Sequence, residues 1–260
     1  PVARARFARR LAAFLLEHGL DGADIDWEYP RNATEWAHHT ALLLELRRAF
    51  FAHGFYLTAA GGSWKPISKP GLALLDWINV MSYDFHGGWE SSGPANHQAP
   101  LYQSPCDGSD ADWSDKAMRA YLSAGVPPSK LLLGVPFYGR GWRGVAPVND
   151  GLCQAAGGVP RGSYEKGVDD FEVLDADGRP DFWDEGTATH WTYNGSEFWS
   201  YDDEQSLGWK ADYVNGLRPP DGETRPTLRG IFFWELSGDA PDGRLLRSLR
   251  DSLGTASPAP

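Results

Sequence analysis

Residues 131–138 constrain the fold more than any other segment of this chain. Their sequence, LLLGVPFY, is a near-continuous apolar run, which is typical of a strand buried on both faces of a parallel sheet. Other strands are predicted at about 22–28, 55–60, 77–85 and 229–236, and helices at about 3–18, 32–53, 114–124, 203–215 and 242–252. This alternation of helix and strand predicts an α/β fold.

An α/β sheet commonly takes one of two forms, an open doubly wound sheet or a closed (β/α)8 barrel. No G-x-G-x-x-G motif follows a predicted strand, which disfavours a dinucleotide-binding fold. Acidic and aromatic residues gather near the carboxyl ends of the predicted strands, where barrel enzymes place their catalytic groups. Both observations favour the barrel.

Composition narrows the class of partner. The net charge of −11 argues against nucleic acid or an anionic membrane as a partner, and no apolar run approaches the ~20 residues of a membrane helix. The 12 Trp, 10 Tyr and 12 Phe exceed what one core ordinarily needs, and the apolar faces of sugar rings stack on such side chains. Carbohydrate binding is therefore favoured.

Neither the cysteines nor the histidines are spaced like metal ligands. Cys106 and Cys153 lie outside any C-x-x-C pattern, and the seven His residues form no H-E-x-x-H motif. We therefore expect no metal. The two cysteines can form one disulfide or remain two buried thiols, and the sequence leaves both alternatives open.

The segment 21–30, DGADIDWEYP, carries three carboxylates at alternate positions: Asp24, Asp26 and Glu28. If the strand continues through Glu28, all three share one face at spacings of about 6.6 Å. Carboxylates that close cannot all ionise freely, so at least one pKa should rise, which keeps a carboxylic acid protonated near neutral pH. The alternative, a solvated acidic edge strand, is disfavoured because Ile25 and Trp27 occupy the opposite face.

This run resembles the D-G-x-D-x-D-W-E signature of the family 18 glycoside hydrolases, the chitinases, and the match continues into Tyr-Pro. The resemblance implies a retaining, substrate-assisted hydrolysis without a cofactor. Glu28 would be the general acid/base. Asp26 would bond the acetamido N–H and stabilise the oxazolinium intermediate, while Asp24 would share a proton with Asp26. Asp21 is expected to be structural.

A second segment matches the M-x-Y-D motif of the same family, with Met81, Tyr83 and Asp84 at its fixed positions. The resemblance implies that Tyr83 donates its hydroxyl to the acetamido carbonyl. Asp84 would contact the sugar or Glu28, and Met81 would line the substrate site. Without the acidic strand, the better reading would place Tyr83 in the core and make Asp84 a strand-end cap.

Four more residues are expected to bind substrate. Trp234 matches the last-strand Trp that floors the −1 subsite, and Tyr138 and Arg140 match a segment that lines the cleft. Arg140 is alternatively a structural partner of Asp84. Trp89 has a spacing that suits a +1 or +2 stacking platform, and an ordinary loop aromatic is the alternative. Glu235 directly follows Trp234. It is therefore expected to point to the face opposite Trp234 and to be a structural residue.

The five predicted strands would correspond to barrel strands four to eight, and the family's S-x-G-G motif is missing together with the first three strands. A truncated barrel is therefore expected. The predicted divisions are barrel at 1–142, a small α+β insertion between the seventh strand and its helix at 143–199, barrel at 200–254 and a tail at 255–260.

The resemblance implies chitin or chito-oligosaccharides as the partner, secretion, and a monomer when full length. Two other functions stay open. A non-catalytic chitin-binding lectin of the same fold is disfavoured because Glu28 is present. An endo-N-acetylglucosaminidase or a peptidoglycan hydrolase is disfavoured by Trp27 and by the insertion.

Overall fold

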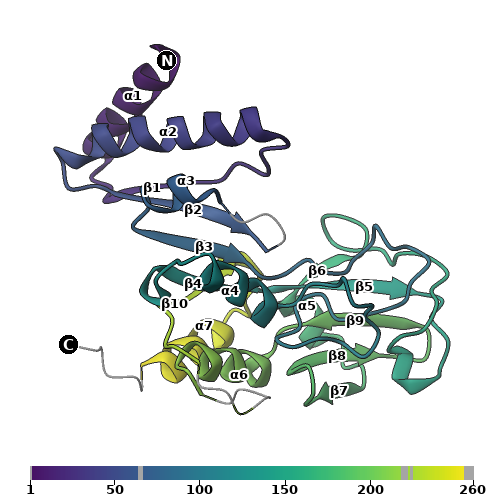
Figure 1. Cartoon of the computed structure of the whole chain (residues 1–260). Helices are drawn as coiled ribbons and strands as arrows, with labels where there is room; N and C mark the ends of the chain where they lie inside the picture. Colours follow the sequence, from purple (N-terminus) through teal and green to yellow (C-terminus); the bar gives the residue numbers. More distant parts are fainter. Residues whose placement is uncertain (1, 64–66, 218–221, 223–224, 255–260) are drawn as a thin grey trace.

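A computed structural model describes residues 2–63, 67–217, 222 and 225–254. Within this part of the chain, a parallel sheet with its helices adjoins a second, antiparallel sheet (Figure 1). The tail predicted at 255–260 lies outside the described residues.

The parallel sheet confirms the predicted α/β class. Its strands run in the order β1-β2-β3-β4-β10 and all pair in parallel. The strand bounds are β1 Gly22–Ile25, β2 Tyr56–Gly62, β3 Trp77–Met81, β4 Leu131–Pro136 and β10 Gly230–Trp234. Among the described residues, β1 and β10 each pair on one side only, so the sheet is open.

The predicted helices form with ends close to those expected. They are α1 Val2–His18, α2 Ala33–Phe51, α4 Ser114–Ser123, α6 Glu204–Val214 and α7 Arg244–Leu253, with a short α3 at Lys69–Leu72. Asn32 begins α2 by accepting a hydrogen bond from the Glu35 backbone N–H at 3.0 Å. Asp203 and Ser206 form a capping box that begins α6. These caps satisfy N–H groups that would otherwise lack a partner in the first turn.

The helices cover one face of the parallel sheet. Alternate strand residues, among them Ile25, Leu57, Ile78 and Leu133, pack into the main hydrophobic core with α1, α2 and α4. The residues between them face the other way, as alternation along a strand requires. That second face carries polar side chains, including Asp24.

The segment predicted as an insertion, together with residues on either side of it, forms the antiparallel sheet, in the order β6-β5-β9-β8-β7. Its strands are β5 Tyr138–Arg143, β6 Val168–Asp170, β7 Asp181–Asp184, β8 Thr189–Tyr193 and β9 Glu197–Tyr201, with a short helix α5 at Phe171–Ala176. It has a core of its own around Trp142, Trp191 and Phe198.

The predicted strand at 131–138 is wrong at its carboxyl end. It comprises β4, which ends at Pro136, and the first residue of β5. Tyr138 therefore belongs to the antiparallel sheet, which begins inside the segment predicted as barrel and ends at Tyr201. The apolar run spans both elements because Phe137, between the two strands, and Tyr138, at the start of β5, are both buried.

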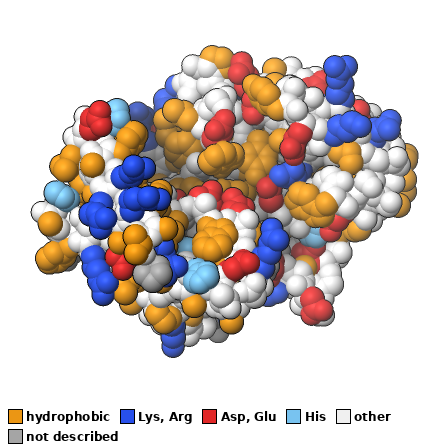
Figure 2. Space-filling view, turned by 90° about the horizontal axis from the view of Figure 1, so that it is seen from above, with side chains coloured by type: hydrophobic (Ala, Val, Ile, Leu, Met, Phe, Trp, Pro, Cys, Tyr) orange, Lys and Arg blue, Asp and Glu red, His pale blue; other side chains and the backbone are white. Residues whose placement is uncertain are grey.

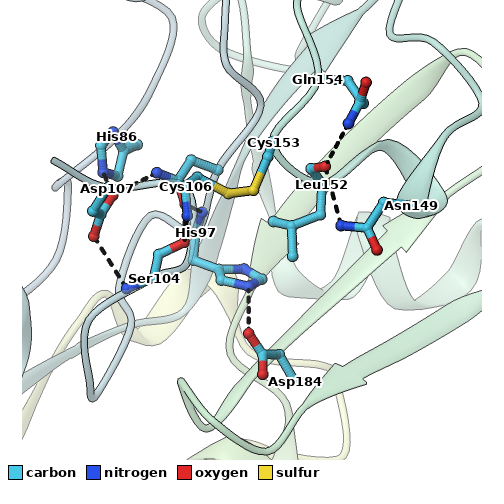
Figure 3. The surroundings of a disulfide bond; sticks show 11 residues. His86, His97, Ser104, Cys106, Asp107, Asn149, Leu152, Cys153, Gln154 and Asp184 are labelled. Atoms are coloured by element: carbon cyan, nitrogen blue, oxygen red, sulfur yellow. Dashed lines mark hydrogen bonds and ion pairs between the residues drawn. A yellow bond between two sulfur atoms is a disulfide. The ribbon is translucent and has the colours of Figure 1, made fainter.

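One disulfide joins Cys106 to Cys153, with an S–S distance of 2.07 Å (Figure 3). It ties the long loop after β3 to the loop that follows β5. Of the two alternatives for these cysteines, the paired one is correct. No described helix is both long and apolar enough to cross a membrane.

Candidate active site

The acidic run lies only partly on a strand. Because β1 ends at Ile25, the side chains of Asp26 and Glu28 come from the connection to α2, and the prediction of a strand through Glu28 is wrong. The run still reaches the carboxyl edge of the parallel sheet, where the connections after parallel strands meet.

A cavity of about 320 Å³ lies at this edge. It is lined by Asp26, Glu28, Tyr29, Met81, Tyr83, Asp84, Tyr138 and Trp234. Seven of these were predicted as site residues, and the eighth, Tyr29, was missed although the sequence match extends over it. Viewed from above, acidic side chains gather in a hollow with hydrophobic side chains around it (Figure 2).

Asp24 lies behind this cavity and does not line it. One of its carboxylate oxygens, Oδ1, accepts hydrogen bonds from the Thr58 hydroxyl at 2.5 Å and from the Asn79 side-chain amide at 3.0 Å. Burial raises the pKa of Asp24, and the nearby Asp26 raises it further, against the lowering effect of the Thr58 hydrogen bond. The neighbouring strands β2 and β3 therefore hold Asp24 in place beside Asp26.

The pKa of Glu28 lies above its ordinary value. Burial raises its pKa, and the charges of Asp26 and Asp84 and a hydrogen bond with Asp26 add to that effect, while a hydrogen bond from Tyr29 opposes it. The expected pKa rise among the three carboxylates thus falls on Asp24 and Glu28. A raised pKa favours the protonated form that a general acid needs near neutral pH.

Tyr83 is buried beside the carboxylates, and burial raises its pKa above the usual range for a tyrosine. Its ring meets Tyr138 at 6.2 Å in an edge-on contact and Phe232 at 6.1 Å. The hydroxyl therefore stays protonated and can donate a hydrogen bond into the cavity. Trp234 is 55% exposed and offers a wide aromatic surface on another side of the cavity.

Asp84 is held by two side chains of β5. The Arg140 Nε and Nη2 groups donate to its two carboxylate oxygens at 2.7 Å each, and the Tyr138 hydroxyl donates to Oδ1 at 2.8 Å. Of the two roles expected for Arg140, the structure shows the partnership with Asp84. The guanidinium also lies over the ring of Trp89, 4.9 Å from its centre.

A second cavity of about 460 Å³ adjoins the first and shares Asp84, Tyr138 and Trp234 with it. Its further lining residues are Arg140, Tyr164, Glu165, Val168, Asp170, Glu235 and Ser237. Glu235 was predicted to point away from the site, and this is wrong because it lines the second cavity. Trp89 lines neither cavity and is 56% exposed beside Arg140.

No group of three or more His, Cys, Asp or Glu side chains among residues 2–63, 67–217, 222 and 225–254 is arranged to hold a metal ion. The charged groups that face the first cavity are carboxylates, and the remaining lining is mostly aromatic. Carboxylates beside exposed aromatic rings suit a neutral, partly apolar ligand such as a sugar chain.

A parallel α/β sheet with carboxyl groups and an aromatic surface at its carboxyl edge is an arrangement that glycoside hydrolases use. The chain belongs to glycosyl hydrolases family 18, whose sequence profile matches residues 1–239.

Known relatives agree with this assignment. Chitinase A1 of Niallia circulans is 35% identical over 291 aligned positions, which include 99% of this chain and 40% of that protein. The chain thus spans about two fifths of that relative's length. The Group IV chitinase of Ostrinia furnacalis in complex with allosamidin has a TM-score of 0.86 at 27% identity, over 98% of this chain and 73% of that one.

A family 18 N-acetylglucosaminidase from Paenibacillus barengoltzii has a TM-score of 0.80 at 30% identity, over 97% of this chain and 76% of that structure. The fold is therefore similar to those of enzymes with different names within one family.

Proposed function

We propose that the protein containing this chain hydrolyses β-1,4 linkages between N-acetylglucosamine units in chitin or chito-oligosaccharides, by a substrate-assisted, retaining mechanism. The observation that carries the proposal is the joint placement of Asp26 and Glu28 in one cavity, with Asp24 hydrogen-bonded behind them.

In the first step, Glu28 donates its proton to the glycosidic oxygen while the acetamido carbonyl oxygen of the −1 sugar attacks C1. The C1–O bond to the leaving sugar breaks, and an oxazolinium ion forms. Asp26 accepts the hydrogen bond of the acetamido N–H and stabilises the positive charge. In the second step, Glu28 removes a proton from water, the water oxygen bonds to C1, and the ring of the oxazolinium opens with net retention.

Other residues position the sugar. The buried Tyr83 hydroxyl donates to the acetamido carbonyl and so directs its oxygen toward C1. Trp234 supplies the floor on which the −1 sugar stacks, and Met81 and Tyr138 complete the wall. Trp89, at the rim next to Arg140, would carry a sugar on the leaving-group side. No residue in this scheme requires a cofactor.

We further propose that the open sheet is part of a (β/α)8 barrel, in which β1 to β4 and β10 are strands four to eight. Support comes from the coverage of helices on one face only and from the TM-scores with family 18 structures. Secretion is supported by the disulfide, since disulfides persist in oxidising compartments. We expect a monomer when the barrel is complete.

Hydrolysis of short oligosaccharides from one end is a second candidate, because a similar structure is named as an N-acetylglucosaminidase. A chitin-binding lectin would use the same cavity but would not need the raised pKa of Glu28. Product lengths from chitohexaose separate hydrolysis from one end from the proposed function. Stepwise release of single sugars would favour hydrolysis from one end.

The mechanism can be tested with the full-length protein and two matched substrates. Chito-oligosaccharides should be cleaved with release of a β-anomer, visible by NMR before mutarotation. Cello-oligosaccharides of equal length should be inert because they lack the acetamido nucleophile. An α-anomer, or products from cello-oligosaccharides, would rule out substrate assistance, and binding of chitin without any cleavage would favour the lectin.

A further inference from the structure

The turn at residues 86–90, just after the Tyr83-Asp84 pair, is held by one histidine. His86 makes two hydrogen bonds to carboxylates, from Nδ1 to Glu90 at 2.9 Å and from Nε2 to Asp107 at 3.0 Å. The Asp107 side chain is 0% exposed. It also accepts from the Asn96 amide at 2.7 Å and from the Ser104 backbone N–H at 3.1 Å.

Asp107 is itself anchored. It follows Cys106 in sequence, and the Cys106–Cys153 disulfide fixes that position to the antiparallel sheet region. Figure 3 shows His86 pointing at Asp107 on one side of the disulfide. The histidine therefore connects the turn to a rigid part of the molecule.

Glu90, at the other end of the bridge, directly follows Trp89 in the sequence. The Glu90 N–H donates to the Gly87 carbonyl at 2.9 Å, and the Glu90 carbonyl accepts from the Trp142 indole at 3.0 Å. Trp89 thus lies between Gly87 and Glu90, which this backbone hydrogen bond joins. Its ring lies against the Arg140 guanidinium that binds Asp84. Both ring nitrogens of His86 are thus engaged, one by Glu90 within the turn and the other by Asp107 outside it.

We propose that His86 is a positioning residue for substrate binding: by bridging Glu90 and Asp107 it holds Trp89 against Arg140 and so sets the orientation of the aromatic platform at the rim of the cavity. The inference rests on the proposed function, because it assigns Trp89 a sugar as its ligand. His86 itself touches neither cavity.

The bridge needs the imidazolium form, since both ring nitrogens face a carboxylate and both must donate. The groups that face His86 are Glu90 from its own turn and Asp107 from the loop beside the disulfide, with His97 as a nearby ring. Burial opposes the charge, but the hydrogen bonds to Asp107 and Glu90 outweigh it and raise the pKa of His86 to about 9. The bridge is complete at neutral pH and is lost as the pH rises through about 9.

Kinetics of the full-length protein on chito-oligosaccharides test the proposal. His86→Gln should raise KM roughly tenfold and change kcat by less than about twofold, as expected when uniform binding is lost. The wild-type KM should rise between pH 8 and pH 10, and the KM of the variant should be flat there. His190→Gln is the matched control, because His190 pairs with Asp181 at 3.3 Å on the antiparallel sheet and lines neither cavity.

A double-mutant cycle separates positioning from general loosening. If His86 acts through Trp89, His86→Gln should have no further effect on KM in a Trp89→Ala background. Additive effects, a fall in kcat with unchanged KM, or no effect of His86→Gln would overturn the proposal. If His86→Gln does not fold, Glu90→Ala removes the more exposed half of the bridge and should also raise KM.

A readout without substrate keeps the two proposals distinguishable. In protein labelled with 5-fluorotryptophan, the Trp89 resonance can be assigned by its absence in Trp89→Phe. It should shift or broaden in His86→Gln, and in the wild type above pH 9. An unchanged resonance would refute the positioning role whether or not the enzyme is active, whereas a wild type that binds and cleaves no chito-oligosaccharide would refute only the proposed function.

Discussion

Arg140 grips Asp84 through both oxygens of the carboxylate, with its Nε and Nη2 groups each 2.7 Å from their acceptors. The pair joins the start of the loop after β3 to a strand of the antiparallel sheet. Asp84 has a left-handed backbone with φ of 59°, a conformation that Asp tolerates better than most residues. A planar guanidinium matches such a carboxylate in a way that a lysine ammonium cannot.

Arg140→Lys should therefore weaken substrate binding while the charge is kept. Loss of one charge-assisted hydrogen bond costs about 1–3 kcal/mol, so we expect KM for chito-oligosaccharides to rise at least fivefold in the full-length protein. The control is Arg47→Lys. Arg47 lies on α2, and its Nη2 group is 2.8 Å from a carboxylate oxygen of Asp76. Equal KM values for the two variants would contradict a role for Arg140 in the site.

Glu28→Gln should keep binding and lose hydrolysis. General acid–base catalysis is typically worth ~10²–10⁴-fold, and substrates with a good leaving group should recover part of the loss because they need less protonation. The exposed Glu185 in the β7–β8 turn offers a matched control, Glu185→Gln. Cleavage by Glu28→Gln at near wild-type rate would show that another group is the acid.

Asp24→Asn should make the protein more stable at neutral pH and less active. Burial raises the pKa of Asp24, so the folded state disfavours the charged form. Stability from this group is present below the unfolded pKa of about 3.9 and is lost as the pH rises through the higher folded pKa. The gain in Tm from Asn should therefore be larger at pH 7 than at pH 4. A gain that is equal at both pH values would show that charge is not its cause.

Removing the disulfide should lower stability without moving the carboxylates of the first cavity. The two cysteines are 47 residues apart, and closing a loop of that size is worth about 4 kcal/mol in the chain-entropy description. The double variant Cys106→Ser, Cys153→Ser should melt roughly 10 °C lower, and reduced wild type should behave alike. A reduced protein with an unchanged melting temperature would contradict this.

The 260-residue chain expressed alone should self-associate. Within the described residues, β1 and β10 leave unpaired backbone groups along their outer sides, and such edges invite pairing with another chain. Sedimentation at increasing protein concentration should show oligomers. An activity assay on chitin should show little cleavage. A monomer that melts cooperatively and cleaves chitin would mean that this sheet needs no further strands.

The site was predictable to the extent that it follows a local motif. The two signatures place Asp26, Glu28, Tyr83 and Asp84 correctly in one cavity, because each motif lies next to the end of a parallel strand. The strand predicted through Glu28 is wrong because alternation of side chains continues beyond the last paired residue, and β1 stops pairing at Ile25.

Contacts between distant segments were harder to predict. The orientation of Glu235 into the second cavity and the start of β5 at Tyr138 depend on how the antiparallel sheet packs against the strand ends. Likewise, the His86 bridge joins residues 21 positions apart, and no periodicity relates them. Such features are set by tertiary packing, which one sequence does not reveal.

The chain passes from the parallel sheet into the antiparallel sheet and returns from it at neighbouring points. β5 begins two residues after β4 ends, β9 ends shortly before α6, and Arg140 of β5 pairs with Ser200 of β9. Trp142, Trp191 and Phe198 form an aromatic core within this sheet, whereas Trp183 and Ala188, at its β7–β8 end, pack into the main core. In evolution, substitutions confined to the aromatic core can alter this sheet while the packing beneath the parallel strands is kept, whereas changes at Trp183 or Ala188 would affect both sheets.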